Sequence, residues 1–471
     1  MEESSLVPAF ADPRRSFDAR VWLLALGTFA VGTDSFVVSG ILNQVARDLA
    51  VDLDAAGRIV SSYSITYALS APILAVLTAR IRKDRLVVGT LVGFSVANAL
   101  CALAPTYSVL LAARLLAGVA AGLYTPTAYS LAVSLAPARR KASALSAVAL
   151  GITGSVLAGV PLGIVVGQHF GWHASFWLVG GLSMIAFSAL AWRPPRALPV
   201  AATRASLAAR FAPLFQGRAL LALLPSLLMA AGISATYTYL GALLRERGFS
   251  TGAIAGWYVL VGAGGVTGTL SGGRLVDRFG AVSILAAFFL LGIADTSLFT
   301  ASLGVPAALA ATCFLLHVTM AGSILGQQRR LIGLAPAHTE VILALNNSCL
   351  YAGIAVGAAV GGGLLTQGYA LGAIPYASSL LLVGALAALG GSLWIEQRAG
   401  RSVPLPRAAQ ASVAARARDA SNPSSFAVCA ATSASLPCRR TNQAGSLYES
   451  NVVPVSSCQT SAFRGRSIPR V

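Results

Sequence analysis

Apolar residues in this chain come in twelve long runs of about twenty residues, separated by short polar connections. The hydrocarbon core of a bilayer is about 30 Å thick, and a helix crosses it in about twenty residues. Because backbone groups in lipid must satisfy their own hydrogen bonds, each run is predicted to be a helix. The predicted spans are 21–43, 57–79, 86–104, 107–132, 143–167, 174–192, 219–243, 253–272, 280–300, 304–326, 340–366 and 371–395.

The charges indicate how the spans are oriented. The chain is 56% hydrophobic and only 11% charged, with a net charge of +18. The N-terminal flank, every second loop and the C-terminal flank hold 21 Lys and Arg residues, whereas the opposite loops hold four: Arg47, Arg58, Arg245 and Arg247. The positive-inside rule then places both termini in the cytoplasm. The excess charge is a topology signal, so the expected partner is the lipid bilayer and not nucleic acid.

The connections divide the chain into five segments. Residues 1–20 are a cytoplasmic N-terminus, 21–192 a first six-helix bundle, and 193–218 an Arg-, Pro- and Ala-rich cytoplasmic linker. Residues 219–395 are a second six-helix bundle. Residues 396–471 are rich in Ser, Ala, Arg and Pro without periodicity, which is typical of a disordered cytoplasmic tail.

The two bundles are related in sequence. Leu77 and Arg80 lie 198 residues before Leu275 and Arg278, in each case where an even-numbered span enters a basic loop. The same offset carries two glycines of span 5 onto glycines of span 11. This pattern predicts an internal duplication into two pseudo-symmetric bundles, an architecture of transporters whose substrate site lies between the repeats.

Neither a cleaved leader nor a metal site is expected. The first apolar run is too long for a signal peptide and lacks a cleavage pattern, so it is interpreted as span 1. The six cysteines have no metal-ligand spacing, and those in a cytoplasmic tail would be reduced. They are expected to be free thiols.

Three motifs stand out. The first is Gly-x-Leu-x-Asp-Arg-x-Gly between spans 8 and 9, made by Gly273, Leu275, Asp277, Arg278 and Gly280. It is interpreted as a loop in which glycine permits a turn and the carboxylate pairs with a nearby basic group or helix N-terminus. In the first half the motif is degraded, although Arg80 is kept. Ala75 replaces the first Gly, Ala79 replaces the Asp and Arg82 replaces the last Gly.

The other two motifs lie in spans 4 and 5. Arg114, followed by Gly118, is about 10 Å deep in the membrane, where an arginine needs a partner or a wet cavity. A snorkelling or helix-pinning arginine is the alternative. Span 5 holds a series of small and kinking residues: Gly151, Gly154, Gly159, Pro161, Gly163 and Gly167. Small residues allow close helix approach, and Pro161 is expected to kink the span.

With these motifs, residues 18–395 resemble the major facilitator superfamily, and within it the drug and sugar efflux branch of proton antiporters. The resemblance implies a twelve-helix fold in two bundles. It implies that the loop with Gly273 and Asp277 latches one conformation, with Arg80 in the counterpart loop. It also implies that Gly151, Gly159, Pro161 and Gly163 form the antiporter packing motif, although the usual Gly-Pro pair reads Gly-Val-Pro here.

Asp34 is the strongest candidate for proton coupling. It lies in span 1 at roughly 14 Å depth, similar to Arg114. The resemblance places spans 1 and 4 on the same central cavity. Burial favours a neutral carboxyl and a nearby cation favours the charged form, so a carboxylate moving between such surroundings can load and release a proton. The alternative is a static ion pair that only fixes packing.

Other polar residues of the spans receive weaker predictions. His317 in span 10 is a second candidate to face the cavity and titrate, and a hydrogen-bonded core histidine is as good an interpretation. Asp295 is expected to snorkel to the interface near the end of span 9. Ring faces and hydrogen bonds for a ligand are expected from Tyr63, Tyr67, Tyr124, Tyr237, Asn346 and Asn347, with about half of the polar and aromatic candidates serving packing instead.

These observations favour proton-coupled efflux of a small organic solute of drug, sugar or nucleoside type across a bacterial inner membrane. The near absence of Lys, present only as Lys83 and Lys141, is typical of a GC-rich bacterial genome. No ATP-binding loop motif is present, so the proton gradient is the expected energy source, with no cofactor. The chain is expected to be no enzyme and to act as a monomer. Proton-coupled uptake is the first alternative; a membrane-embedded enzyme or a sensor is the second.

Overall fold

A computed structural model describes residues 19–78, 81–137, 140–193, 217–335 and 339–402. Residues Met1–Gly400 form one compact unit, and Arg401–Val471 are a separate one. The predicted N-terminus up to residue 18, the linker over 194–216 and the tail beyond 402 lie outside the described residues, as does Arg80.

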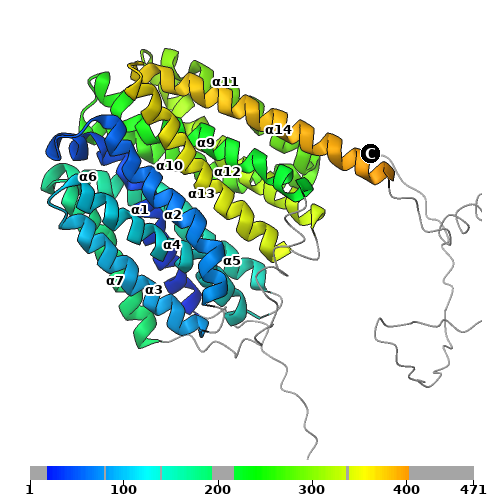
Figure 1. The fold of residues 1–471 in the computed structure, drawn as a ribbon, viewed down its shortest axis with the longest axis horizontal. Coiled ribbons are helices and arrows are strands. Elements are labelled where there is room, and N and C mark those ends of the chain that lie inside the picture. Colours follow the sequence, from blue (N-terminus) through cyan, green and yellow to red (C-terminus); the bar gives the residue numbers. More distant parts are fainter. Residues whose placement is uncertain (1–18, 79–80, 138–139, 194–216, 336–338, 403–471) are drawn as a thin grey trace, which may run out of the picture. The chain divides into compact units, whose positions relative to one another are not determined.

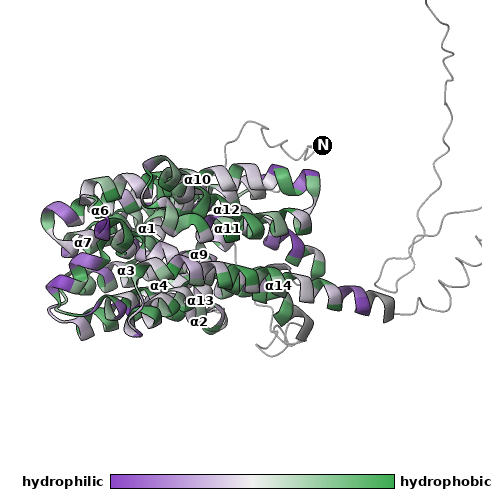
Figure 2. Ribbon diagram, turned by 90° about the horizontal axis from the view of Figure 1, so that it is seen from above, coloured by the Kyte–Doolittle hydropathy of each residue, from purple (hydrophilic) through white to green (hydrophobic). Residues whose placement is uncertain are grey.

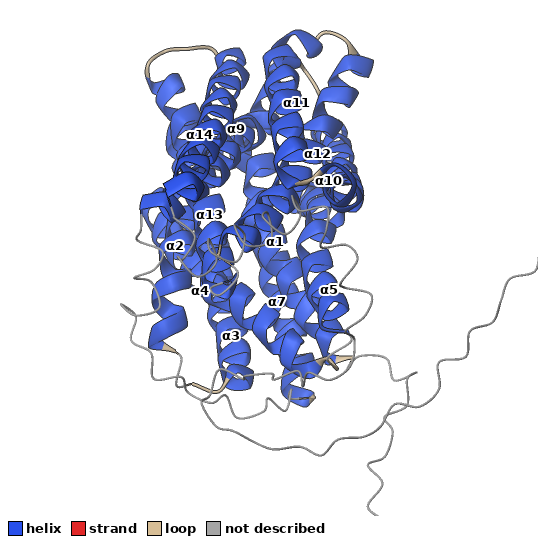
Figure 3. Cartoon of the chain, turned by 90° about the vertical axis from the view of Figure 1, so that its right-hand side faces the viewer, coloured by secondary structure: helices blue, strands red, loops and turns tan. Residues whose placement is uncertain are grey.

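The described part of the chain is helical and contains no strand (Figure 3). The first half comprises α1 (Arg20–Asp48), α2 (Leu53–Leu77), α3 (Lys83–Ala102), α4 (Tyr107–Leu135), α5 (Lys141–Gly154), the π-helical turn η2 (Ser155–Gly159), α6 (Val160–Phe170) and α7 (Trp172–Trp192). The second half comprises α9 (Gly217–Glu246), α10 (Thr251–Phe279), α11 (Ala281–Ser302), α12 (Pro306–Leu334), α13 (Thr339–Thr366), the 3₁₀ turn η4 (Leu371–Ala373) and α14 (Ile374–Ser402).

The helices match the twelve predicted spans, with α5, η2 and α6 forming one continuous span. Eleven of them are long and apolar enough to cross a membrane within the described residues. The remaining one, α2, has 25 residues, enough to rise about 37 Å. Figure 2 shows hydrophobic residues along most of the helices and hydrophilic residues mainly toward the helix ends. The prediction of an all-α membrane fold is confirmed.

Several helices extend beyond their predicted ends. The prediction that Gly273 to Gly280 form a loop is wrong, because α10 continues to Phe279. The segment before Gly280 contains residues that a helix accepts, and it ends only where Gly280 takes φ +86°, a left-handed conformation that favours glycine. Likewise α14 continues to Ser402, past the predicted end at residue 395.

The packing repeats between the two halves, which occupy opposite sides of Figure 1 in blue to cyan and in green to orange. A Cβ atom added at Gly159 would lie 2.0 Å from Thr33 Oγ1 on α1. One added at Gly357 would lie 2.3 Å from the Ala231 carbonyl oxygen on α9. Both glycines and both partners are 198 residues apart, so span 11 packs on span 7 as span 5 packs on span 1. The pseudo-symmetric bundles are confirmed.

Candidate functional site

A buried ion pair joins α1 to α4. Arg114 Nη1 lies 2.7 Å from Asp34 Oδ1, and neither side chain is exposed at all. Asp34 lies in the middle of α1 and Arg114 two turns into α4, and the two helices pack against each other. The two residues that the sequence placed at similar depth are therefore direct partners.

Aromatic rings surround this pair. The Arg114 Cζ atom lies 4.1 Å from the centre of the Tyr63 ring of α2 and 5.8 Å from that of Phe176 of α7. The Tyr63 hydroxyl lies 3.0 Å from Ser35 Oγ, next to Asp34 on α1. A cation over an aromatic face is stabilised by the ring quadrupole, most strongly where water is excluded. Two further helices, α2 and α7, thus meet at the ion pair or beside it.

The ion pair leaves polar atoms unsatisfied. Within the described residues, neither Asp34 Oδ2 nor Arg114 Nε has a hydrogen-bond partner. A buried carboxylate is stable as an ion only when charge and hydrogen bonds compensate it. Asp34 receives both its charge partner and its hydrogen bond from Arg114 Nη1, so a change at Arg114 would alter which protonation state of Asp34 is favoured.

A second cluster continues from the ion pair into the other half of the chain. Phe36, two residues after Asp34, lies edge-on to Tyr237 of α9 with ring centres 5.6 Å apart. His317 of α12 lies 5.0 Å from Tyr237 and 6.4 Å from Phe36, and Tyr258 of α10 lies 5.3 Å from Tyr237. The Tyr237 hydroxyl and His317 Nδ1 have no hydrogen-bond partner among the described residues. The Tyr258 hydroxyl also lacks a hydrogen-bond partner among the described residues, so the cluster is aromatic with unpaired polar atoms on Tyr237, Tyr258 and His317.

A third contact between the halves is a stacked pair. The rings of Tyr67 on α2 and Tyr351 on α13 lie 3.5 Å apart at 12°. Tyr67 is also 6.3 Å from Tyr63, so an aromatic path runs from the Arg114 guanidinium to the second half. Of the predicted ligand contacts, the structure brings Tyr63, Tyr67 and Tyr237 close to the ion pair or to these aromatic clusters.

The other predicted ligand contacts are placed differently. The Tyr124 hydroxyl donates to the Leu24 carbonyl oxygen at 2.9 Å and occupies the gap left by Gly27, so it serves α1–α4 packing. Asn346 is buried and accepts a hydrogen bond from Ser226 of α9. Asn347, beside it on α13, is half-buried.

Beyond these clusters the halves also meet on the predicted outer side. Ser61 Oγ of α2 donates to the Ala355 carbonyl oxygen of α13 at 3.1 Å, and Thr366 Oγ1 donates to Asp54 Oδ2 at 3.0 Å. Burial raises the pKa of Asp54, but hydrogen bonds from Thr366, the Ala55 backbone and Arg58, together with the Arg58 charge, outweigh it and lower the pKa below its ordinary value. Asp54 is therefore a charged acceptor that ties the two halves together.

The predicted latch motif occupies the last two turns of α10. Gly273 and Leu275 are half-buried, while Asp277, Arg278 and Gly280 are exposed. The Arg278 guanidinium lies 5.1 Å from the Phe279 ring centre, and Asp277 makes no ion pair within the described part of the chain. The predicted pairing of Asp277 with a basic residue is thus not present there, and pairing with a helix N-terminus stays a prediction.

The span 5 motif forms a tight seam on α1. Cβ atoms added at Gly151 and Gly163 would lie 2.2 Å from the Ala25 carbonyl oxygen and 2.4 Å from Val37 Cγ2. Pro161 is the second residue after the π turn η2. Proline lacks the N–H that would continue the helical hydrogen bonds. The helix is locally widened into a π turn just before Pro161, at the position where the sequence predicts a kink.

The burial of two charged residues with consequences for packing, Arg330 and Asp295, was not predicted from the sequence. Arg330, counted there as a loop residue, is 6% exposed on α12; it hydrogen-bonds Ser392 at 2.6 Å and pairs with Glu396, both on α14. Ser392 and Glu396, four residues apart at the end of the last apolar run and so on one face of a helix that continues past it, were a usable signal.

Asp295 is the second. Its expected position at the interface is wrong, because it is 3% exposed and neither of its carboxylate oxygens has a hydrogen-bond partner among the described residues. It shares the buried face of α11 with Gly292, Thr296 and Phe299, so the helix rotation, which the sequence does not specify, buries it.

Metal chemistry finds no support in the described residues, where no group of three His, Cys, Asp or Glu side chains could hold an ion. The arrangement offers instead a buried, singly paired carboxylate beside aromatic clusters that bridge two bundles.

Comparisons with known proteins agree with this architecture. The sequence model of the Major Facilitator Superfamily matches residues 24–358. The uncharacterized MFS-type transporter YbcL of Bacillus subtilis (strain 168) is 30% identical over 385 residues, covering 80% of this chain and 95% of that protein. The inner membrane transport protein YdhP of Escherichia coli (strain K12) is 29% identical over 374 residues, covering 76% and 94%.

Two further similarities are more limited. The chloramphenicol resistance protein of Streptomyces lividans is 32% identical over 265 residues, which cover 55% of this chain and 67% of that protein. Among solved structures, the nucleoside transporter NupG has a TM-score of 0.65 at 14% identity, with 80% of this chain and 100% of that chain covered. At 14% sequence identity, this similarity shows a shared fold alone.

Proposed function

Since the chain belongs to the Major Facilitator Superfamily and is an integral membrane transporter rather than an enzyme, we propose that it exports a small organic solute in exchange for protons. The proposed membrane is the bacterial inner membrane, and the proposed solute is of drug, sugar or nucleoside type. Efflux and proton coupling are supported by two things: the relative named for chloramphenicol resistance, and the chemistry of the buried ion pair.

The Asp34–Arg114 pair is the observation that carries the proposal. In the charged state, Arg114 compensates Asp34 through the 2.7 Å contact. Protonation of Asp34 removes that attraction and leaves a neutral carboxyl, which a buried site tolerates better than an unpaired carboxylate. Arg114 then keeps its contact with the Tyr63 ring and is available to another acceptor. Proton binding at Asp34 is thereby linked to the position of Arg114.

Alternating access would connect this event to transport. α1 carries Asp34 and, two residues later, packs Phe36 against Tyr237 and His317 of the second half. A movement of α1 that accompanies Asp34 protonation would therefore displace Phe36 and change the contact between the halves. Substrate and proton would compete for the state in which the Asp34–Arg114 pair is open, and that competition is the basis of antiport.

Transport in inverted membrane vesicles tests the proposal. Respiration acidifies the vesicle lumen, and a pH-sensitive dye reports protons that leave when a solute is added. The panel holds chloramphenicol, a cationic dye, sugars and nucleosides. We expect solute-induced proton release with the wild-type protein and none with Asp34→Asn. Asp295→Asn is the matched control, since it removes another buried carboxylate away from the ion pair.

The outcomes are distinct. Proton release that persists in Asp34→Asn would exclude Asp34 as the coupling carboxylate. Equal loss in Asp34→Asn and Asp295→Asn would assign both effects to general damage. Proton movement in the same direction as the solute would replace export by uptake.

A further inference from the structure

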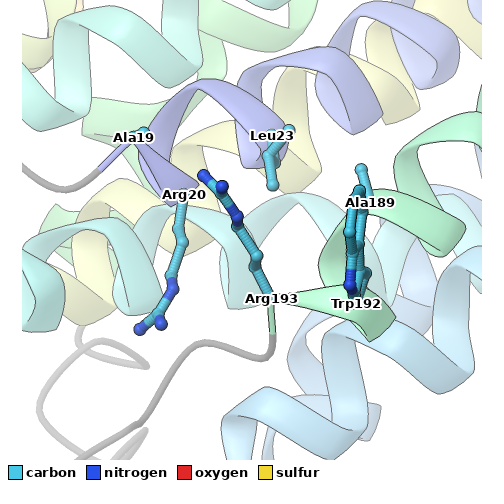
Figure 4. A pocket seen from close by; sticks show the side chains of 6 residues that line it. All are labelled: Ala19, Arg20, Leu23, Ala189, Trp192 and Arg193. Atoms are coloured by element: carbon cyan, nitrogen blue, oxygen red, sulfur yellow. The ribbon is translucent and has the colours of Figure 1, made fainter.

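Among the described residues, the hollow shown in Figure 4 does not gather groups around one ligand. It lies at the start of α1 and the end of α7, and the Arg20 and Arg193 guanidinium groups point away from each other. A pair of rings that do face one space, one from each half of the chain, lies instead at the middle of the spans.

Tyr67 on α2 and Tyr351 on α13 lie face to face. Their ring centres are 3.5 Å apart and their ring planes meet at 12°. Carbon atoms of stacked rings touch at about 3.5 Å, so the two rings overlap with little offset. Tyr67 is fully buried and Tyr351 is 7% exposed.

This face-to-face stack is not the arrangement that two phenol rings prefer. Each ring has a negative face and a positive edge, so aromatic pairs favour offset or edge-to-face contacts over a direct stack. The ring of Tyr237 follows that preference, because it meets Phe36 at 83° and Tyr258 at 88°. The packing of α2 on α13 therefore holds two electron-rich faces together, and an electron-poor ring placed between them would be attracted by both.

Polar groups lie at the edge of the stack. The Tyr67 hydroxyl has no hydrogen-bond partner among the described residues, although Thr125 of α4 and Asn347 of α13 are its polar neighbours. A buried hydroxyl without a partner is costly, and a ligand that supplies the hydrogen bond removes that cost. Tyr67 therefore offers a ring face and an unpaired hydroxyl to the same molecule.

The stack is the innermost of the contacts that join α2 to α13 across the halves. The hydrogen bonds of Asp54 and Ser61 with α13 lie nearer the predicted outer ends. A separation that begins on the inner side would part the two rings while those hydrogen bonds stay closed. A planar ring needs a gap of about 7 Å between the two tyrosine faces, which is about 3.5 Å more than the rings have here.

We propose that Tyr67 and Tyr351 clamp a planar, electron-poor aromatic ring of the transported solute, such as a nitrophenyl group or a pyrimidine base, when the inner ends of α2 and α13 part. This inference rests on the proposed function and names the class of solute within it. A sugar has no flat π face, so the clamp favours aromatic solutes over sugars.

The clamp lies beside the ion pair. The rings of Tyr67 and Tyr63, one turn apart on α2, have centres 6.3 Å apart, and the Tyr63 ring contacts Arg114. A solute ring on Tyr67 is thus separated from the guanidinium by a single aromatic side chain. This proximity connects solute binding to the group that compensates Asp34.

Equilibrium binding to the purified full-length protein tests the clamp without a proton gradient. Isothermal titration calorimetry in neutral detergent uses chloramphenicol, which carries a nitrophenyl ring, and uridine as planar probes. Dihydrouridine, whose base is partly saturated and puckered, and glucose are the non-planar probes. We expect the wild type to bind a planar probe about tenfold or more tightly than the non-planar ones, since a stacked ring contributes about that factor.

Variants at the two tyrosines identify the site. Tyr67→Leu and Tyr351→Leu each remove a ring face and should weaken binding of the planar probe about tenfold. Tyr67→Phe keeps the ring and loses only the hydroxyl, so its affinity should fall by no more than about fivefold. Tyr124→Leu is the matched control, because Tyr124 is equally buried and its hydroxyl serves the packing of α4 on α1.

Three results would overturn the proposal. The first is binding of dihydrouridine or glucose as tight as that of the planar probes, or no binding of either planar probe. The second is unchanged affinity in both leucine variants, and the third is an equal loss in Tyr124→Leu. If the leucine variants do not fold, the comparison of uridine with dihydrouridine on the wild-type protein decides.

Failure of the clamp and failure of the proposed function give different results. Solute-induced proton release in vesicles, together with binding that is insensitive to Tyr67 and Tyr351, would reject the clamp and keep proton-coupled export. Binding that depends on both tyrosines, without proton release, would keep the clamp and reject proton-coupled export.

Discussion

At the scale of single residues, the chain's most consequential feature is a charge pair that is fully buried and incompletely hydrogen-bonded. Asp34 and Arg114 are both 0% exposed, yet Asp34 Oδ2 and Arg114 Nε find no partner among the described residues. Bringing both charges out of water is costly, and a better compensated pair would be more stable. A pair of this kind contributes little net stability, but its two members depend strongly on each other.

Replacing Arg114 by Met should therefore destabilise the protein by about 3–5 kcal/mol, because the Asp34 carboxylate loses the one charge partner that it has among the described residues. Adding Asp34→Asn to that variant should recover most of the loss, since the amide carries no charge to compensate. Thermal unfolding of the purified variants in one detergent measures both effects. If the double variant were no more stable than Arg114→Met alone, the dependence would lie in packing around Tyr63 rather than in charge.

At the scale of elements, the span made of α5, η2 and α6 is built to lie close to α1. Glycines at 151, 159 and 163 bring its backbone against α1 side chains and carbonyl groups, and the π turn precedes Pro161. Small residues at such a contact allow dispersion and weak hydrogen bonds to act over a short distance. Because α1 carries Asp34, this seam also determines how α1 can rotate or slide.

Gly159→Ala should loosen this seam. The added methyl group would lie 2.0 Å from Thr33 Oγ1 and 3.1 Å from the Phe29 ring, so neighbouring atoms must shift, at a cost of about 1–3 kcal/mol. Gly181→Ala on α7 is the matched control, because nothing lies within 4 Å of its added carbon. The unfolding temperature is expected to fall in Gly159→Ala and to stay unchanged in Gly181→Ala. Equal effects on the unfolding temperature would mean that the helix propensity of alanine, and not its contact with α1, determines the change in stability.

At the scale of the whole molecule, several contacts join the halves from the middle of the spans to the predicted outer side. Ser61 with Ala355, Thr366 with Asp54 and the Tyr67–Tyr351 stack all join α2 to α13. Figures 1 and 3 both place these two helices side by side between the halves. A transporter that works by alternating access must separate such a contact during its cycle.

Cross-linking this contact should stop transport. Cysteines placed at Ser61 and Ala355 and joined by a short thiol-reactive linker would hold α2 on α13, and flux should fall to background until the linker is reduced. Cysteines at Thr296 and Ser379, whose hydroxyl oxygens lie 2.8 Å apart on α11 and α14, are the control within one half. Transport that survives the first cross-link would show that α2 and α13 need not separate.

The Asp54 contact should respond to pH in a defined direction. Its pKa is lowered below the ordinary 3.8, so its stabilisation is present above that value and is lost only as the pH falls through the lower folded pKa. The rate at which an impermeant maleimide labels Ala355→Cys, divided by its rate with a free thiol at the same pH to cancel the ionisation of the thiol, should therefore stay constant between about pH 7 and 5. It should be faster in Asp54→Asn at every pH. A rise in labelling of the unaltered contact near pH 6 would contradict this assignment.

The sequence by itself determined the membrane class, the number of spans, the two related halves and the candidate pair Asp34 and Arg114. Hydropathy over about twenty residues and charge between spans are local properties, so no knowledge of packing is needed to read them. The internal repeat could be predicted because it too is a property of the sequence alone: Gly159 and Gly357 occupy equivalent positions in spans 5 and 11.

Only the tertiary structure decided which polar groups meet. Rotation of a helix about its axis determines whether Asp295 lies at the surface or in the interior, and hydropathy does not report that angle. Arg330 meets Glu396 across 66 residues and Asp34 meets Arg114 across 80. The end of α10 likewise depended on where Gly280 adopts its left-handed conformation and not on where charged residues begin. Partners distant in the chain are selected by packing, because each charge brought out of water must find its compensation in the folded arrangement.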